Sequence, residues 1–444
     1  MELKQRAQMD PAYQWDLTAI YENDAAWERA MEKAAEAVKE LKGLPGTLGA
    51  SAQALADGLD KIYAASALVE RAYIYATLRR DGDNADPGGQ EMSGKSTTLY
   101  VEFSTNTAFL EPEILAIDEK TLAEYLKEER LATYRHLIGN IVRGRAHVLG
   151  AEQEKMLAML SDAAGGFRKS FSMLESVDMS FPAITDEAGE SVTLSHGNFA
   201  VYRESRDQRV RKEAFEAYFG EFKRYINTFA ALYEGSVKMD CYYAKVRGFD
   251  GACEAALFGT NVPIAVYDAL TDAVHDAFPT MQRYLALRKK QLGVKELHMY
   301  DLYCPMVENV DISVPFADAK TLVKKALAPL GEEYAKLLDR AFAEKWIDVY
   351  ENKGKTTGAF SCGVFGVHPY VLLNYTDTLD DAFTLAHELG HSMHSYFSDH
   401  TQDYVNHDYE IMVAEVASTV NEVLLTKYLL SVETDPARRA YILN

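Results

Sequence analysis

The most informative stretch of this chain is His387-Glu388-Leu389-Gly390-His391. On a helix, residues four positions apart lie on one face with Cβ atoms roughly 5–6 Å apart, so His387 and His391 can both reach one metal ion. Glu388 lies beside them and is suited to accept a proton from a metal-bound water rather than to bind the metal. The pattern therefore predicts a metal site with its own general base.

The neighbouring sequence places this motif on a helix. Asp380, Asp381 and Thr384 supply acidic and capping side chains near its start, and apolar or small residues recur as far as Met393. The alternative is a pair of histidines on an ordinary amphipathic helix, which the bare motif leaves open.

A catalytic zinc needs a third protein ligand and an open position for water. After a polar loop over residues 398–407, the apolar spacing predicts a helix over Tyr409–Leu430. Glu415 lies inside this run, and a carboxylate among apolar neighbours is costly to bury unless it is paired or bound to a metal. We therefore favour Glu415 as the third ligand.

Other carboxylates remain candidates for the same role, namely Glu422, Glu410 and Asp408. Glu422 lies two turns beyond Glu415 on the same face, so it could instead accept a hydrogen bond from a ligand histidine. His394 follows the motif on the same helix, and we expect it to be a packed or supporting residue because three ligands already suffice. His400 and His407 are expected in the solvated loop.

Longer segments extend the pattern. They are Leu17–Tyr21, Met299–Tyr303, Gly354–Ser361, His368–Tyr375, His387–Tyr396 and Val413–Glu422. With them the chain resembles the oligoendopeptidase F branch of the thimet-oligopeptidase-like zinc metallopeptidases, and the match spans most of its length.

The resemblance implies a mainly α, two-lobed helical enzyme with a deep channel for short peptides and a small β-sheet beside the active-site helix. It implies one Zn²⁺ held by His387, His391 and Glu415, with Glu388 as the general base of a zinc endopeptidase. A zinc carboxypeptidase and a zinc-bound, peptide-binding pseudo-enzyme are the alternatives that we retain.

Helical periodicity dominates the first part of the chain. Helices are predicted over residues 25–42 and 51–80, followed by a loop over residues 81–89 that is rich in polar and helix-breaking residues. Short apolar pieces over Phe181–Leu194 predict a β-hairpin, which we take as the seam between lobes. We divide the chain into an N-terminal helical lobe (1–110), a helical segment ending in the hairpin (111–200) and the catalytic domain (201–444).

The composition of residues 355–375 predicts β-strands. An extended peptide can add to a sheet edge through main-chain hydrogen bonds, and Gly358 and Ala359 have side chains small enough to let a substrate backbone approach. We therefore expect substrate contact at these two residues and at His368. An ordinary buried hairpin that supports the active helix is equally compatible with the pattern.

Composition narrows the possible functions of this chain of 444 residues. Its net charge of −21 argues against nucleic-acid binding. The four cysteines lack Cys-x-x-Cys spacing, so they indicate neither a disulfide scaffold nor a thiolate metal site, and we expect buried thiols. Neither a signal core nor a membrane-spanning run is present in the sequence, which favours a cytoplasmic protein.

The end of the sequence bears on activity. In the resembled family, a segment bearing Tyr and His beyond the third-ligand helix supports the reacting oxyanion, and no such segment precedes Asn444 here. We therefore expect a chain that is incomplete at its C-terminal end, in which zinc binding is retained and full activity is impaired. Cleavage preference and oligomeric state do not follow from the sequence.

Overall fold

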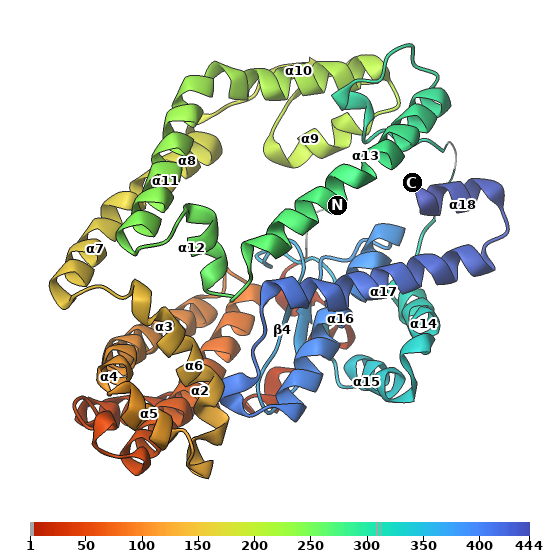
Figure 1. Cartoon of the computed structure of the whole chain (residues 1–444). Coiled ribbons are helices and arrows are strands. Elements are labelled where there is room, and N and C mark those ends of the chain that lie inside the picture. The colour runs from red at the N-terminus through yellow and green to blue at the C-terminus, as the bar shows by residue number, and fades with distance from the viewer. Residues whose placement is uncertain (1–3, 308–309, 311) are drawn as a thin grey trace. The chain divides into compact units, whose positions relative to one another are not determined.

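The computed structural model describes residues 4–307, 310 and 312–444. Helices make up most of the described chain, with two small sheets between them (Figure 1). The prediction of a mainly α fold with a small sheet beside the motif helix is confirmed. None of the helices in the described residues is long and apolar enough to cross a lipid bilayer.

The chain forms two compact units. Unit 1 comprises Met1–Arg145 and Asp311–Arg438, and unit 2 comprises Ala146–Val310 and Arg439–Asn444. These boundaries differ from the divisions expected at residues 110 and 200. The predicted hairpin does not mark the seam, because it lies inside unit 2.

Unit 1 holds the first helices together with the motif helix and a three-stranded sheet. Its helices are α1 (Asp24–Glu40), α2 (Ala52–Gly82), α3 (Pro87–Thr107), α4 (Leu110–Ala116), α5 (Glu119–Tyr125), α6 (Arg135–Arg143), α14 (Phe316–Ala326), α15 (Glu332–Ala343), α16 (Leu379–Thr401) and α17 (Ile411–Val432). Its strands are β3 (Ile347–Asp348), β4 (Phe360–Cys362) and β5 (Tyr370–Leu372). Helix α18 (Pro436–Leu443) follows α17.

The loop predicted over residues 81–89 is too long. Helix α2 continues to Gly82 and α3 begins at Pro87. Asp86 caps α3 by accepting hydrogen bonds from the backbone N–H groups of Gly88 and Gly89, at 3.2 Å each. Asp-Pro is a favourable pair for the start of a helix, because Pro lacks the N–H that a first turn leaves unpaired. The polar composition concealed this signal.

A shared core joins the first helices to the sheet. Trp27 of α1 and Tyr75 of α2 pack in one buried cluster with Tyr370 and Leu372 of β5. The indole N–H of Trp27 donates to the carbonyl of Ala72 at 2.8 Å, which satisfies the polar atom of a side chain that is 1% exposed. The N-terminal helices are therefore part of the unit that carries the motif.

A buried ion cluster fixes the N-terminal segment to the same sheet. Arg6 binds both carboxylate oxygens of Asp348, at 3.0 and 2.5 Å, and Nζ of Lys355 lies 2.8 Å from Oδ1. Asp348 is 1% exposed, so its charge needs these partners. Burial lowers the pKa of Lys355, although the charge of Asp348 opposes that shift.

The three-stranded sheet has the order β3-β5-β4. β3 pairs with β5 in parallel, with Ile347 opposite Val371, and β4 pairs with β5 antiparallel, with Ser361 opposite Val371. All three residues of β5 are buried. β4 is therefore an edge strand of this sheet, and Figure 1 shows it beside α16.

Unit 2 is helical around a short hairpin. Its helices are α7 (Ala151–Ala164), α8 (Gly166–Met173), α9 (His196–Arg203), α10 (Gln208–Arg224), α11 (Ile226–Val246), α12 (Ala252–Phe258) and α13 (Ile264–Leu292). Strands β1 (Ala183–Thr185) and β2 (Ser191–Thr193) pair antiparallel, which confirms the hairpin expected over Phe181–Leu194. Cys241 and Cys253 of this unit are exposed, so the expectation of buried thiols is wrong for both.

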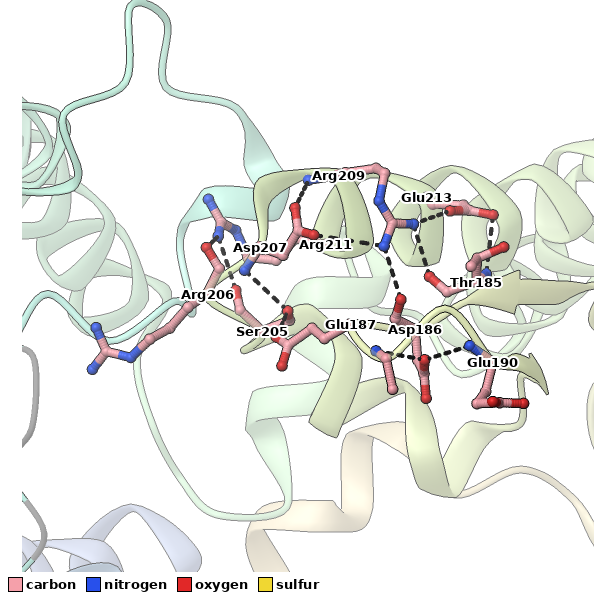
Figure 2. A network of polar contacts seen from close by, with 11 residues as sticks. Thr185, Asp186, Glu187, Glu190, Ser205, Arg206, Asp207, Arg209, Arg211 and Glu213 are labelled. Carbon is pink, nitrogen blue, oxygen red and sulfur yellow. Dashed lines mark hydrogen bonds and ion pairs between the residues drawn. The ribbon is translucent and has the colours of Figure 1, made fainter.

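Arg209 of α10 holds the hairpin in place (Figure 2). Its guanidinium donates to the carbonyls of Thr185 at 2.9 Å and Asp186 at 2.8 Å, and it pairs with Glu213 at 3.1 Å. The backbone N–H of Thr185 in turn donates to Glu213 at 3.2 Å. A two-stranded hairpin is marginal alone, and this clamp ties it to a long helix.

Candidate active site

The motif helix α16 starts at a reciprocal cap. The hydroxyl of Thr378 accepts from the N–H of Asp381 at 3.1 Å, and Oδ2 of Asp381 accepts from the N–H of Thr378 at 3.0 Å. This capping box satisfies two donors that a helix start leaves unpaired, and the acidic first turn complements the helix dipole. The sequence prediction of a helix with acidic capping residues at its start is confirmed.

Three predicted ligands converge between α16 and α17. Nε2 of His387 and Nε2 of His391 lie 3.1 Å apart. Oε2 of Glu415 lies 3.6 Å from the first nitrogen and 3.7 Å from the second. Among the described residues, these three form a group whose ligand atoms all lie within 4.8 Å of one another. Asp408 and Glu410, the other candidates for third ligand, do not belong to this group.

Glu415 is not buried, contrary to the expectation on which it was chosen as third ligand. The Glu415 side chain is 50% exposed, and its neighbours Met412, Val413 and Val416 are 50–57% exposed. The face of α17 that packs on α16 carries Ala414, Ser418, Asn421 and Leu425. The apolar pattern therefore pointed away from the contact face, and Glu415 reaches the histidines from the edge of the helix interface.

The two helices approach closely at Gly390. A Cβ atom at this position would lie 2.7 Å from the carbonyl oxygen of Ala417 and 2.7 Å from Cα of Ser418. Asn421, which is 1% exposed, donates from Nδ2 to the carbonyl of Ala386 at 2.9 Å. The role of Asn421 was not predicted from the sequence. Its partner Ala386 lies 35 residues away in the chain, so no local pattern signals the contact.

Glu422 contacts the other nitrogen of His387. Oε1 of Glu422 lies 2.5 Å from Nδ1 of His387. With Nδ1 donating to this carboxylate, Nε2 of the same ring carries a free lone pair that faces His391 and Glu415. The arrangement matches the hydrogen-bonding role that the sequence offered for Glu422.

Burial changes the protonation of the site. Glu388 is 7% exposed, and desolvation raises its pKa to about 7, with a nearby His387 lowering it and Glu415 raising it further. Desolvation and then the charge of His387 lower the pKa of His391. A neutral imidazole and a carboxyl group that exchanges its proton near neutrality are therefore available side by side.

Strand β4 is fastened to the motif helix. Oγ of Ser361 lies 2.8 Å from Oγ of Ser392, which donates to the carbonyl of Glu388 at 2.9 Å. Gly358 and Ala359 immediately precede this edge strand, and a Cβ at Gly358 would meet open space. Both residues therefore lie next to the strand that packs on the motif helix.

His368 does not lie where a substrate could touch it. It is 7% exposed, its ring stacks on Trp346 with centroids 4.7 Å apart, and its Nδ1 lies 2.9 Å from the carbonyl of Pro369. The proline fixes an extended backbone, and the ring packs inward from it. The expectation of substrate contact at His368 is corrected to a packing role.

His394 is packed, as expected from its position. Its ring stacks on Tyr409 with centroids 3.7 Å apart, and burial lowers its pKa. His407, by contrast, is only partly exposed, and its Nδ1 lies 2.8 Å from Oδ1 of Asp399. Burial would lower the pKa of His407, but the hydrogen bond to Asp399 and the charge of that carboxylate outweigh burial and raise it. This pair ties the loop after α16 back to the helix.

Comparisons with known proteins agree with this geometry. Residues 201–444 match the family described as Peptidase family M3, and residues 113–181 match the one described as Oligopeptidase F. Oligopeptidase PepF of Bacillus subtilis is 40% identical over 444 residues, which cover all of this chain and 66% of that protein. Group B oligopeptidase PepB of Streptococcus agalactiae is 38% identical, over 99% of this chain and 73% of PepB. The chain thus spans about two thirds to three quarters of these relatives.

Solved structures give the same assignment. A putative peptidase from Chlamydophila abortus matches with a TM-score of 0.89 and 32% identity, over 100% of this chain and 74% of that one. An oligoendopeptidase-F from Enterococcus faecium matches with a TM-score of 0.66 and 35% identity, over 95% and 70% of the two chains. As the sequence motifs predicted, the chain belongs to peptidase family M3, among relatives named oligoendopeptidase F.

Proposed function

We propose that this chain is a zinc-dependent endopeptidase that hydrolyses short peptides. The observation that carries the proposal is the convergence of three ligand atoms, from His387, His391 and Glu415, beside the buried carboxyl group of Glu388. Family membership supports peptide hydrolysis, and the names of the relatives, which are called oligopeptidases, support short peptides as the substrate class.

The donor set fits zinc. Ligand atoms about 2.0–2.1 Å from a tetrahedral ion lie about 3.3–3.4 Å apart, and the three distances here are 3.1, 3.6 and 3.7 Å. Two imidazoles and one carboxylate are a usual set for a catalytic zinc, and they leave a fourth position for water. Bound there, zinc would polarise a carbonyl and make a water nucleophilic near neutral pH.

Glu388 supplies the proton transfers. Its carboxylate accepts a proton from the attacking water and then delivers that proton to the leaving amine, so one group acts first as base and then as acid. Burial suits it to both steps, because it brings the pKa to about 7. General-base assistance of this kind is typically worth about 10²–10⁴ in rate.

Glu422 and β4 position the other participants. Glu422 holds Nδ1 of His387, which fixes the ring orientation and the tautomer that can bind a metal. β4 offers the main chain of an edge strand, so an extended peptide can bind through backbone hydrogen bonds with little dependence on its side chains.

The test uses the full chain and an internally quenched short peptide whose two ends are blocked. Cleavage should require one bound zinc, stop on chelation and return when zinc is added. Glu415→Ala should lose zinc and turnover, whereas Glu332→Ala, an exposed glutamate on α15, should retain both. A carboxypeptidase would leave the blocked peptide intact. Parental zinc affinity in Glu415→Ala would overturn the ligand assignment.

A further inference from the structure

A small cavity in unit 1 lies along the first two turns of the motif helix α16. It has a volume of about 250 Å³, and its walls include Gly358, Ala359, Asn374, Tyr375, Asp381 and Thr384. We call it the Asp381 pocket. Sites for small-molecule ligands usually measure about 300–1,000 Å³, so this cavity suits one side chain better than a separate molecule.

Helix geometry places the Asp381 pocket next to the ligands. Thr384 precedes His387 by three residues, so the two side chains lie on one face of α16 with about 4.5 Å of rise between them. On the opposite side, Gly358 and Ala359 lead directly into the edge strand β4. A peptide extended along β4 with its scissile bond at the metal would carry a neighbouring side chain over this cavity.

Hydrogen bonds make the walls of the pocket firm. Nδ2 of Asn374 donates to the carbonyls of Thr356 at 3.0 Å and Gly358 at 2.8 Å, which holds the segment before β4. Oδ2 of Asp381 accepts from the backbone N–H groups of Thr376 at 2.9 Å and Thr378 at 3.0 Å. The cavity therefore belongs to a braced part of the fold.

One oxygen of Asp381 is left for a ligand. Oδ2 also accepts from the hydroxyls of Thr376 and Thr378, while no donor to Oδ1 occurs among the described residues. Burial would raise the pKa of Asp381, but these hydrogen bonds outweigh it and lower the pKa, so the group is charged at neutral pH. The pocket wall thus holds an ionised carboxylate with unused accepting capacity.

The acidic side chain in its wall gives the cavity a negative electrostatic potential. Burial first, and then the charges of Asp381 and Asp377, raise the pKa of Tyr375 in the pocket wall. The helix dipole contributes only about half a positive charge at the start of α16. The full negative charge of Asp381 in the first turn exceeds it, so a cation entering the cavity meets net attraction.

We propose that the Asp381 pocket receives a basic side chain, lysine or arginine, of the substrate residue next to the scissile bond. The inference rests on the proposed peptidase function and adds a specificity-determining residue to it. Apolar walls from Ala359 and Tyr375 would cover the stem of such a side chain, while Oδ1 of Asp381 accepts from its charged end.

The experiment compares peptides that are identical except at either residue flanking the cleaved bond, where each carries arginine or its neutral isostere citrulline. For the parent chain with zinc, kcat/KM should be about tenfold higher with arginine at one of the two positions. Asp381→Asn should remove this preference. Asp380→Asn makes the same charge change on an exposed side chain outside the pocket and should retain it.

Binding separates this inference from the proposed function. In Glu388→Gln, the ratio of Kd values for the citrulline and arginine peptides should still be about tenfold, and Asp381→Asn in that background should bring it to one. Equal values for both peptides at both positions would overturn the pocket assignment, whatever the rate. Loss of the preference in Asp380→Asn as well would also overturn it, whereas absent hydrolysis with a retained Kd ratio would overturn only the proposed catalysis.

If Asp381→Asn unfolds, Thr384→Lys provides a second test, because it places a cation inside the cavity. It should remove the arginine preference, and a retained preference would refute the proposal.

Discussion

Replacing Gly390 by alanine should weaken zinc binding although Gly390 is not a ligand. The added Cβ would lie 2.7 Å from two backbone atoms of α17, the carbonyl oxygen of Ala417 and Cα of Ser418. Ordinary contact begins at 3.4 Å, so the two helices must separate by about 0.7 Å at this point. No side-chain rotation can relieve a clash with backbone.

The displacement is large compared with what a metal site tolerates. Ligand distances normally hold within about ±0.2 Å, and α16 carries both histidines while α17 carries Glu415. We expect zinc affinity to fall about 10–100-fold, as when the surroundings of other metal ligands are disturbed. Overpacking should also lower the free energy of unfolding of the zinc-free chain by about 1–3 kcal/mol.

Two measurements check this result. Competition with a chromophoric chelator gives the zinc affinity, and urea unfolding without zinc gives the packing cost separately. Gly139→Ala on α6 is the matched control, since a Cβ there meets nothing within 4 Å, and it should leave zinc binding unchanged and stabilise the helix by up to about 1 kcal/mol. Parental zinc affinity and parental unfolding in Gly390→Ala would refute the close-approach argument.

Three further substitutions test the site and its surroundings. Glu388→Gln should keep zinc but lower turnover about 10²–10⁴-fold, because an amide cannot accept the proton; turnover at matched zinc content measures this, and a parental rate would exclude Glu388 as the base. Glu422→Gln should weaken zinc binding about 10–100-fold by loosening His387, which chelator competition measures, and unchanged affinity would remove that role. Asp399→Asn removes the partner that raises the pKa of His407. Because the pKa of His407 is higher in the folded state, the pair with Asp399 stabilises the fold below the unfolded pKa near 6.5, and this stabilisation is lost as pH rises through the folded pKa. In the variant, urea unfolding should therefore show a free energy of unfolding lower by an amount on the order of 1–2 kcal/mol near pH 5.5, and a smaller loss near pH 8.5. Equal losses at both pH values would contradict the pairing.

The part of the site that is local in sequence could be predicted from it. The spacing of His387 and His391 and the capping residues before them are properties of one helix, and helical geometry turns them directly into positions in space. Ser392 and Asn421 could not be assigned in this way. Their roles depend on Ser361 and Ala386, which lie 31 and 35 residues away in the chain, respectively.

Hydrophobic periodicity failed on α17 for a physical reason. The rule that apolar residues mark the buried face assumes that burial is achieved by large side chains. Near Gly390 the contact with α16 is made by small and polar residues, because the two backbones meet there and leave little room between them. Glu415 was expected to be buried among apolar neighbours, but its side chain is 50% exposed.

The loop before α3 shows a second limit of composition. Gly and Asp residues over 81–89 favour a loop on average, but Asp86 and Pro87 together are a start signal whose meaning depends on their order. Order was also decisive at Thr378 and Asp381, where the three-residue spacing makes a reciprocal cap. In both segments, the order and spacing of two residues determined where the helix begins, and the average composition did not.

One helix controls both nitrogens of His387. Glu415 and Glu422 are seven residues apart on α17, two turns along one face and about 10.5 Å in rise. Long side chains let them reach back toward each other, so that one carboxylate lies 3.6 Å from Nε2 and the other 2.5 Å from Nδ1 of the same ring. A shift of α17 therefore changes the ligand distance and the hydrogen bond that orients the ligand at once. The close backbone contact at Gly390 limits that shift, which is why a residue without a side chain is expected to affect zinc affinity about as strongly as Glu422.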